Sequence, residues 1–401
     1  ITQGSLALTG AAAGNYTLNF TPGSGTINKA TLTVKANNDA RFVVGETEQA
    51  NYAGVSYSGF VNGETSSALN TSGLQVVRQG SGAGGVLDTA DQLAGVYSGK
   101  LIPSGITSTN YNLSYQSGDY TIVPAQELLV RVVPTSTVYG ASSGYSVTAA
   151  YLQSNNNRID FVANASSGPR FTITNNQVSL NDGASGTATF TLAPQSPSNS
   201  TAGKLQVGSY QVGATGLSIG GTNFNALNVV GSHEVTPKSL TWLPTSAPTK
   251  VYDGTTGIAS LSLTPSGVVA GSQTDVLSLS TGSAVYSARH VGTTNYVVSD
   301  VRLGGVDAAN YVLGGPTALT NVVTGTDTST GATFSNGTIT ARPIAVTANA
   351  HSKVYGDSDP ALTYAVSGLV PGDTLTATLS RASGEAVAGG GYAITQSAVS
   401  I

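Results

Sequence analysis

The chain has 401 residues, of which 9% are charged, and it contains 50 glycines and no cysteine. A formal net charge of −4 excludes the basic surface that neutralises nucleic-acid phosphates or docks on anionic lipid. The absence of cysteine excludes disulfides, thiolate nucleophiles and zinc–thiolate sites. Few charges and many small polar residues instead predict β-sheets joined by turns, in about two to four domains.

The first 28 residues have the pattern of the end of a β unit. Asn15-Tyr16 leads an alternation through Leu18 and Phe20, which predicts a strand with one buried face. The tripeptide Ile1-Thr2-Gln3 recurs as Ile394-Thr395-Gln396 near the other end of the chain. We therefore expect the two ends to be partial copies of one unit, within a piece taken from a longer tandem array.

Four signatures recur along the chain. The first is a pair of apolar residues two positions apart, which places both side chains on one face of a strand. We expect this strand to open each unit. The pairs are Leu32/Val34, Leu128/Val130, Leu240/Trp242 and Ile344/Val346.

The second signature is a turn that contains glycine and follows each opening strand. Glycine adopts the positive φ that a chain reversal needs, and an aromatic residue before it can lie over the end of the unit. Val44 stands where the other turns have tyrosine. The turns are Val44-Gly45, Tyr139-Gly140, Tyr252-Asp253-Gly254 and Tyr355-Gly356-Asp357.

The third signature is a corner with two glycines around an apolar pair. Ser58-Gly59-Phe60-Val61-Asn62-Gly63-Glu64-Thr65 and Ser367-Gly368-Leu369-Val370-Pro371-Gly372-Asp373-Thr374 agree in type at seven of eight positions. Ser266-Gly267-Val268-Val269-Ala270-Gly271 is a third copy. The pattern predicts a tight corner in which Phe60 or Leu369 fills the core.

The fourth signature is an asparagine followed by an aromatic residue at the start of a strand. Tyr111, Leu113 and Tyr115 alternate, which again predicts one buried and one solvated face. A short helical turn is expected between Leu87 and Ala94. The pairs are Asn15-Tyr16, Asn110-Tyr111, Asn223-Phe224 and Asn310-Tyr311.

These signatures divide the chain just before each opening strand. We predict truncated units at 1–28 and 342–401 (the end segment), and whole units at 29–123 (module one), 124–237 (module two) and 238–341 (module three). Module two lacks the corner and carries polar insertions that we expect to be exposed loops. They lie around Asn155-Asn156-Asn157-Arg158 and from Pro194 to Ser200.

The fold predicted from these patterns is all-β. It is a tandem array of β-sandwich-like modules of about 100 residues each, which together form an elongated rod. A β-grasp-like module is the alternative, because the corner and the short helical turn would also fit that fold.

Two parts of the chain resemble known bacterial repeats. Lys353 through Tyr364, followed by the corner at 367–374, resembles the MBG repeats of giant bacterial adhesins, and module one is similar to them. Lys250 through Thr256, with Gly305 through Tyr311, looks like the companion YDG repeat. The resemblance implies a filamentous-haemagglutinin-like exoprotein exported by two-partner secretion, a class that includes biofilm-matrix adhesins. It supplies no catalytic residues.

Three groups of residues have spacings found in catalytic or zinc sites. Gly140-Ala141-Ser142-Ser143-Gly144 has the spacing of a nucleophile elbow, but that site requires a strand-to-helix turn. Because these residues fall on the recurring glycine turn, we predict a structural role, and we interpret Gly356-Asp357-Ser358 in the same way. His233, His290 and His351 lie in different units, so we expect solvated or turn-capping histidines rather than a zinc site.

A calcium site is the remaining metal hypothesis. Asp357, Asp359 and Asp373 could place carboxylates at a junction between units, where calcium would stiffen a rod. Because 20 acidic residues are few for a calcium-dependent array, we favour turn-stabilising roles and predict no cofactor. Trp242 occupies the position of Val34 in the opening strand, which predicts core packing rather than a platform for sugar stacking.

The function expected from the sequence is that of a stalk or spacer in an extracellular bacterial adhesin that mediates biofilm aggregation or surface attachment, and not that of an enzyme. The alternative is an array of carbohydrate-binding modules that holds matrix polysaccharide. Extracellular polysaccharide and neighbouring adhesin molecules are the expected partners. The sequence has neither a basic-apolar leader nor a long apolar run, so we expect this segment to make no contact with a membrane. An adhesive site, if this segment has one, is expected on the polar loops of module two.

Overall fold

The computed structural model describes residues 15–19, 21–61, 64–316, 322–323, 331–387 and 390–401. Ile1-Thr2-Gln3, Phe20 and Asn62-Gly63 lie outside these residues. The described chain is all-β, and its helical residues form only short 3₁₀ turns. One of these turns, Ala90–Gln92, lies within the segment where the sequence predicts a helical turn. In the described residues, no helix is long and apolar enough to cross a membrane.

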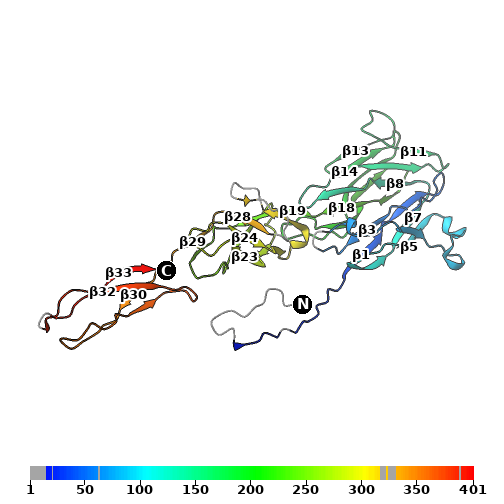
Figure 1. Cartoon of the computed structure of the whole chain (residues 1–401). Coiled ribbons are helices and arrows are strands. Elements are labelled where there is room, and N and C mark those ends of the chain that lie inside the picture. Colours follow the sequence, from blue (N-terminus) through cyan, green and yellow to red (C-terminus); the bar gives the residue numbers. More distant parts are fainter. Residues whose placement is uncertain (1–14, 20, 62–63, 317–321, 324–330, 388–389) are drawn as a thin grey trace.

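Module one consists of two small sheets packed face to face (Figure 1). The sheets have the orders β3-β1-β6 and β2-β7-β5-β4. Ala36, Val76, Leu101, Tyr120 and Ile122 fill the space between them. The strands are β1 (Ala30–Ala36), β2 (Asp39–Phe42), β3 (Val55–Ser58), β4 (Gln75–Arg78), β5 (Gly95–Ser104), β6 (Tyr111–Gln116) and β7 (Gly118–Val123).

Module two has the largest core of the described chain. A four-stranded sheet, β11-β10-β8-β17, covers a seven-stranded sheet, β12-β13-β14-β15-β16-β18-β9, and alternating side chains from both fill the layer between them. The strands are β8 (Glu127–Val132), β9 (Thr135–Val138), β10 (Val147–Leu152), β11 (Arg158–Asp160), β12 (Val162–Ala163), β13 (Arg170–Thr174), β14 (Gln177–Asn181), β15 (Thr187–Pro194), β16 (Gly208–Gly220), β17 (Ala226–Val230) and β18 (Ser232–Thr236).

Module three is built around Trp242, Tyr296 and Phe334, which lie in one aromatic cluster. Its sheets are β21-β19-β26, β20-β29, β22-β25 and β23-β24-β28-β27. The strands are β19 (Lys238–Pro244), β20 (Thr249–Val251), β21 (Leu263–Ser266), β22 (Ser278–Ser280), β23 (Ser283–Tyr286), β24 (Tyr296–Ser299), β25 (Arg302–Gly304), β26 (Tyr311–Pro316), β27 (Val322–Val323), β28 (Ala332–Phe334) and β29 (Thr338–Thr340).

The end segment contains two strand pairs, β30-β31 and β32-β33. In the described part of this segment, Val370 is the only buried hydrophobic side chain, with 8% of its surface exposed. The end segment therefore has little core of its own. Its strands are β30 (Ala345–Ala348), β31 (Tyr364–Ser367), β32 (Thr376–Arg381) and β33 (Ile394–Ser400).

The same strand topology recurs and explains the sequence signatures. The opening strand is antiparallel to the strand that precedes the Ser-Gly corner and parallel to the strand that follows the Asn-Tyr pair, as β1 is to β3 and β6. Strand β19 pairs with β21 and β26 in the same way. Strands β1, β8 and β19 are central in their sheets, so their apolar pairs are buried on one face. Strand β30 pairs with one strand only, and its apolar pair is half-buried. The opening strands predicted from the sequence are confirmed.

The array is elongated, but its first two modules lie side by side (Figure 1). Module three and the end segment then follow one another. A cluster of buried side chains joins modules one and two, and it includes Phe42 and Val123 from the first and Leu129 and Leu152 from the second. Modules one and two therefore share a small apolar core at their contact.

Two expectations about side-chain burial were wrong. Residues 15–19 and 21–28 contain no strand, and Tyr16 is 70% exposed because no described strand pairs with this segment. In the corner, Phe60 and Leu369 are only partly buried. The second apolar residue is instead the buried one in module three and the end segment, where Val269 is 6% and Val370 8% exposed.

Candidate functional site

The contact between modules two and three contains four buried polar side chains, Ser200, Asp275, Asp307 and Asn310. Asp275 of module three is 6% exposed and lies against the Tyr139 turn of module two. Its Oδ2 accepts hydrogen bonds from Tyr139 Oη at 2.5 Å and from Tyr311 Oη at 2.6 Å. Its Oδ1 accepts one from the Ala202 backbone nitrogen at 2.9 Å. A single carboxylate therefore joins three chain segments from two modules.

The environment of Asp275 keeps its carboxylate ionised. Burial by itself raises the pKa, but the bonds from Tyr139, Tyr311 and Ala202 favour the charged form and bring the pKa below its ordinary value. The same burial raises the pKa of Tyr139, so its hydroxyl stays a donor. The Tyr139 and Tyr311 rings meet edge to face at 5.2 Å. The contact therefore combines packed aromatic rings with charge-assisted hydrogen bonds.

A second polar group of module three holds a loop of module two. Asp307 accepts hydrogen bonds from the backbone nitrogens of Thr201 and Val276, at 3.0 and 2.8 Å. Asn310 accepts one from Val207 at 2.9 Å. The polar insertion that ends at Ser200 thus leads into the junction. Its residues 195–199 are exposed as expected, but Ser200 is 8% exposed and bonds to Tyr139.

The contact between module three and the end segment repeats this construction. Tyr252 Oη donates to Asp373 Oδ2 at 3.0 Å. Gly254 has φ +79°, and a Cβ added there would lie 2.8 Å from Cγ1 of Val370. Gly140 has φ +85°, and a Cβ added there would lie 2.7 Å from Cγ2 of Val269. At both junctions a Tyr-Gly turn lies on the corner of the next module, so we name the contact the turn–corner junction.

Modules one and two meet in another way. The turn of module one has Val44 instead of tyrosine, and module two has no Ser-Gly corner. Glu46, just after this turn, pairs with Arg131 at 2.5 Å and with Arg158 at 2.7 Å. The shared apolar cluster lies alongside these ion pairs. Where the tyrosine is missing from one module, the corner is therefore missing from the next.

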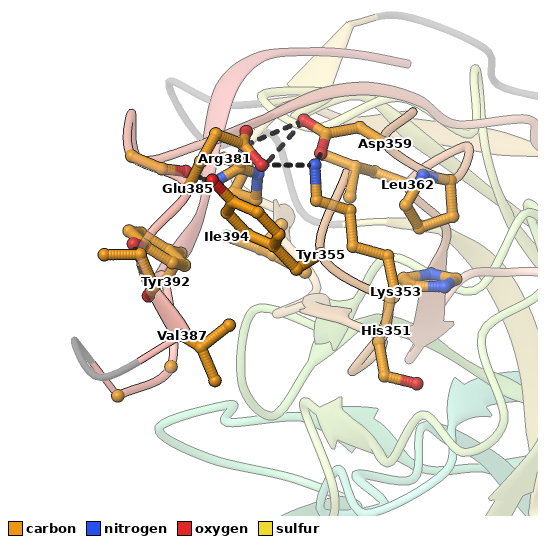
Figure 2. Close-up of a pocket in the computed structure, with 16 residues that line it drawn as sticks. His351, Lys353, Tyr355, Asp359, Leu362, Arg381, Glu385, Val387, Tyr392 and Ile394 are labelled. Atoms are coloured by element: carbon orange, nitrogen blue, oxygen red, sulfur yellow. Dashed lines mark hydrogen bonds and ion pairs between the residues drawn. The ribbon is translucent and has the colours of Figure 1, made fainter. Parts of the chain in front are cut away.

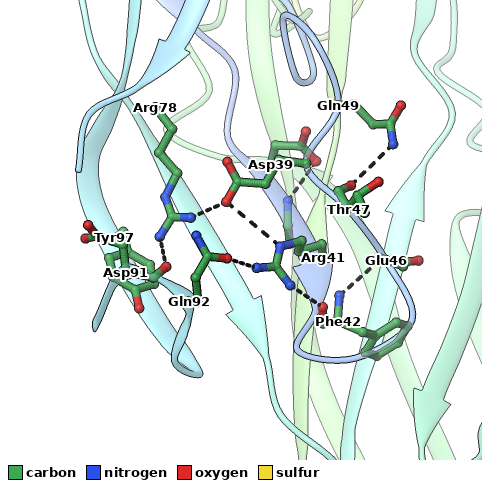
Figure 3. Close-up of polar contacts among 12 residues, drawn as sticks. Asp39, Arg41, Phe42, Glu46, Thr47, Gln49, Arg78, Asp91, Gln92 and Tyr97 are labelled. Atoms are coloured by element: carbon green, nitrogen blue, oxygen red, sulfur yellow. Dashed lines mark hydrogen bonds and ion pairs between the residues drawn. The ribbon is translucent and has the colours of Figure 1, made fainter. Parts of the chain in front are cut away.

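Module one also contains a buried arginine pair that the sequence analysis missed (Figure 3). The Arg78 guanidinium lies between the rings of Tyr97 and Tyr120, at 4.2 and 4.5 Å from their centroids, and forms an ion pair with Glu48. Arg41 donates to the Phe42 carbonyl at 2.8 Å. Neither arginine stands in a motif, and only the alternation of β4, which places Arg78 on the same face as Val76, could have indicated an inward direction.

The end segment carries a surface pocket of about 300 Å³ (Figure 2). Lys353 pairs with Asp359 at 2.6 Å and with Glu385 at 2.7 Å. Arg381 pairs with Asp359 at 3.0 Å and with Glu385 at 2.8 Å, and its guanidinium lies 5.0 Å from the Tyr392 ring centroid. The hydrogen bond from Lys353 lowers the pKa of Asp359, and the hydrogen bond from Arg381 lowers it further. Two cations and two anions neutralise one another, which leaves a polar surface without net charge.

The predicted elbow residues lie in a loop of module two. Residues 139–146 connect β9 to β10, with no helix after Ser142. His233 is buried, with 1% of its surface exposed. Its Nδ1 lies 3.0 Å from the Thr135 hydroxyl and its Nε2 lies 3.0 Å from the Thr137 hydroxyl. Our expectation of a solvated or turn-capping role is wrong for this residue, because β18 turns its side chain inward.

The other two histidines are exposed. His351 Nε2 lies 3.0 Å from the Thr363 hydroxyl and accepts a hydrogen bond from the Thr363 backbone nitrogen at 3.3 Å, which is a turn-capping role. In the described residues, no three histidine or acidic side chains are grouped as a metal site would require. Serine and histidine candidates are not brought together.

The structure separates the three aspartates of the calcium hypothesis. Asp359 belongs to the ion-pair cluster of the pocket. Asp373 accepts a hydrogen bond from the Tyr252 hydroxyl at the junction between module three and the end segment. Asp357 is exposed. Trp242 is 1% exposed within the module three core, as predicted. The loop around Asn156 is exposed, also as predicted.

The fold and its junctions define a tandem array of all-β modules. Residues 32–121 and 344–400 match the MBG domain of the YGX type, and residues 236–321 match the YDG domain. No significant match is found among curated proteins or among solved structures. The chain therefore contains MBG and YDG domains, as the sequence resemblance indicated, and these domains suggest a repeat protein of an adhesin-like or carbohydrate-binding type.

Proposed function

We propose that this segment is a structural stalk or spacer of an extracellular bacterial adhesin that serves biofilm aggregation or surface attachment, in an exoprotein exported by two-partner secretion. The observation that supports this function best is the buried turn–corner junction at Asp275, repeated in a weaker form at Asp373. Two consecutive contacts of one design would hold the angle between modules in such a spacer. The match to repeat domains supports the same function.

A spacer works through reach and stiffness. A flexible chain gains length only as the square root of its residue number, whereas folded modules with fixed junctions gain it in proportion to module number. Hydrogen bonds across a junction oppose the movement of one module against the next. The apolar side chains packed around them exclude the water that would compete for these bonds. In this proposal the segment performs no catalysis, binds no nucleic acid and requires no cofactor.

The test uses bacteria that display the parent adhesin. Deleting this segment should reduce attachment, and replacing it with unrelated rigid β-repeats of equal length should restore attachment. A flexible glycine-serine linker with the same number of residues should not restore it. Full restoration by the flexible linker, or no effect of the deletion, would refute the spacer function.

One observation supports the alternative of carbohydrate binding. The end-segment pocket presents Tyr355, which is 71% exposed, beside Tyr392 and four charged side chains that can exchange hydrogen bonds with sugar hydroxyls. Extracellular polysaccharide would then be a direct partner. Titration of the chain with matrix polysaccharide fragments, followed by NMR, should show saturable shifts at these residues, and Tyr392→Ala should abolish them. A pure spacer would show no saturable site.

A further inference from the structure

A short link joins modules one and two at one end of their contact. The Val123 carbonyl accepts a backbone hydrogen bond within module one, at 3.0 Å. The Gln126 nitrogen donates a backbone hydrogen bond within module two, at 2.7 Å. Between these two anchored residues lie only Pro124 and Ala125. The link therefore has the length of a hinge, and it keeps the two modules together at this end.

At the opposite end of the contact, the chain enters module one and leaves module two. Strand β1 begins at Ala30, and its antiparallel register with β3 places this start on the side of Ser58. Ser58 lines a groove together with Glu234 and Pro237, which lie at the end of module two. The entry and the exit of the chain are therefore neighbours. Modules one and two form a hairpin of modules that is closed by the short link (Figure 1), and we name this pair the module hairpin.

The contact inside the module hairpin is strongest beside the link. The apolar cluster at this end includes Phe42 of module one and Leu152 of module two. Glu46 forms ion pairs with Arg131 and Arg158 of module two, at 2.5 and 2.7 Å. Packed apolar side chains and charge-assisted hydrogen bonds together resist separation here.

The contact becomes weaker towards the open end. In its middle, Gln211 of module two holds the turn between β1 and β2. Its Nε2 donates to Asn37 Oδ1 at 3.0 Å, and its Oε1 accepts a hydrogen bond from the Asn38 nitrogen at 3.3 Å. At the open end, a groove separates Tyr57 of module one from Glu234 of module two. Separation can therefore begin at the open end, where few bonds have to break at once.

We propose that the module hairpin opens about its link when the chain is pulled, before any module unfolds, and closes again when the pull ends. Tension reaches the pair at Ala30 and Pro237, which both lie at the open end, so it breaks the contact one bond after another. This inference rests on the spacer function, because a stalk that carries load is what uses the added length.

The length gained on opening follows from the strands. Residues 30–42 run from the open end to the link, where Phe42 pairs with Val123. At about 3.3 Å per residue they span about 40 Å, and opening moves two such arms apart, so the gain is at most about 80 Å. Unfolding of one module of about 100 residues releases about 300 Å instead. The size of a step therefore distinguishes opening from unfolding.

Optical tweezers test this device in the whole chain. Because the chain has no cysteine, Lys29→Cys and Ser239→Cys allow DNA handles to be attached on the two sides of the module hairpin. Both positions are exposed. We expect an early step of at most about 80 Å that reverses when the force is lowered. The steps of about 300 Å should follow at higher force.

Two variants weaken the contact and leave the module cores unchanged. Gln211→Ala removes both hydrogen bonds to the turn of module one, so the open fraction at a fixed force should rise about tenfold. Glu46→Lys places a cation beside the two arginines of module two and should lower the opening force further. Gln177→Ala and Asp357→Lys change exposed residues outside the contact and should open like the unchanged chain.

Three results would overturn the proposal. They are a trace without an early step, an early step that does not reverse, and an early step that keeps its force in both contact variants. Thermal unfolding of each variant verifies that the modules remain folded. The absence of an early step would leave the spacer function intact, since that function fails only in the attachment test with the flexible linker. The two failures are therefore distinguishable.

Discussion

At the scale of single residues, Asp275 is a buried carboxylate that joins modules two and three. A buried carboxylate loses its hydration, and it is tolerated only where donors replace the lost water. Tyr139, Tyr311 and Ala202 supply these donors from both sides of the junction. The charge therefore ties the two modules together, since each module alone supplies only part of its hydrogen bonds.

Replacing Asp275 with asparagine should destabilise module three and its junction. The amide keeps the shape but loses the charge that strengthens the tyrosine bonds, so we expect a loss of about 2 kcal/mol in unfolding free energy. Trp242 is the sole tryptophan and lies in the module three core, so its fluorescence during urea unfolding reports this module. Asp357→Asn, at an exposed position, is the matched control. Equal midpoints for the two variants would contradict this role.

His233 should make module two sensitive to mild acid. Burial lowers its pKa below the ordinary value of about 6.5 that it regains on unfolding. Below that value the unfolded chain binds more protons than the folded one, so the stability is present above it and is lost as pH falls towards the folded pKa. Thermal unfolding between pH 7 and pH 5 should show the decline. His233→Gln should flatten it and exposed His290→Ala should not.

At the scale of elements, the Tyr-Gly turn owes its conformation to glycine and its position to the neighbouring module. Gly45, Gly140, Gly254 and Gly356 all have φ between +79° and +93°, although only Gly140 and Gly254 face a corner valine. The local sequence therefore sets the turn conformation before any contact is made.

Gly140→Ala should separate these two effects. Any L-residue at this φ costs about 1 kcal/mol in backbone strain, and the added Cβ would also lie 2.7 Å from Val269. Gly45→Ala has a similar φ of +82° and open space around the added Cβ, so it has only the backbone cost. Unfolding free energies should fall clearly more for Gly140→Ala. An equal loss would show that the turn does not press on the corner.

The arginine pair fixes a second element, the loop between β4 and β5. Arg78 reaches this loop through the Asp91 carbonyl, at 2.5 Å, while stacked between Tyr97 and Tyr120. Arg78→Ala would remove these contacts and leave Glu48 without its closest ion-pair partner, so we expect a loss of about 3 kcal/mol. Hydrogen exchange should accelerate over residues 79–94. Exposed Arg289→Ala should leave exchange unchanged, and normal protection in Arg78→Ala would contradict the assignment.

At the scale of the whole molecule, several small cores in succession and the buried contacts that join them predict an extended and stiff particle. A compact globule of this length would have a radius of gyration of about 21 Å. X-ray scattering should give a clearly larger value and a maximum dimension typical of a rod. The double variant Tyr139→Ala, Asp275→Ala should broaden the distance distribution without unfolding the modules. A radius near that of the globule would contradict the array.

The side-by-side contact of modules one and two shows what the sequence alone does not reveal. The sequence indicated that Val44 replaces the turn tyrosine and that module two lacks the corner. It did not indicate that Glu46 bonds to Arg131 and Arg158 instead. These partners are separated by 85 and 112 residues along the chain, and no local pattern connects residues so far apart.

The amino-acid sequence by itself determined the β character, the opening strands, the glycine turns and the core position of Trp242. These features follow from strand alternation and from the backbone freedom of glycine, which act over a few neighbouring residues. The tertiary structure alone decided that Val269 is covered and Val61 open, that Asp275 is a buried acceptor, and that Arg78 and His233 point inward. Burial and hydrogen bonding between modules depend on which distant surfaces meet, and the local order of residues does not encode that meeting.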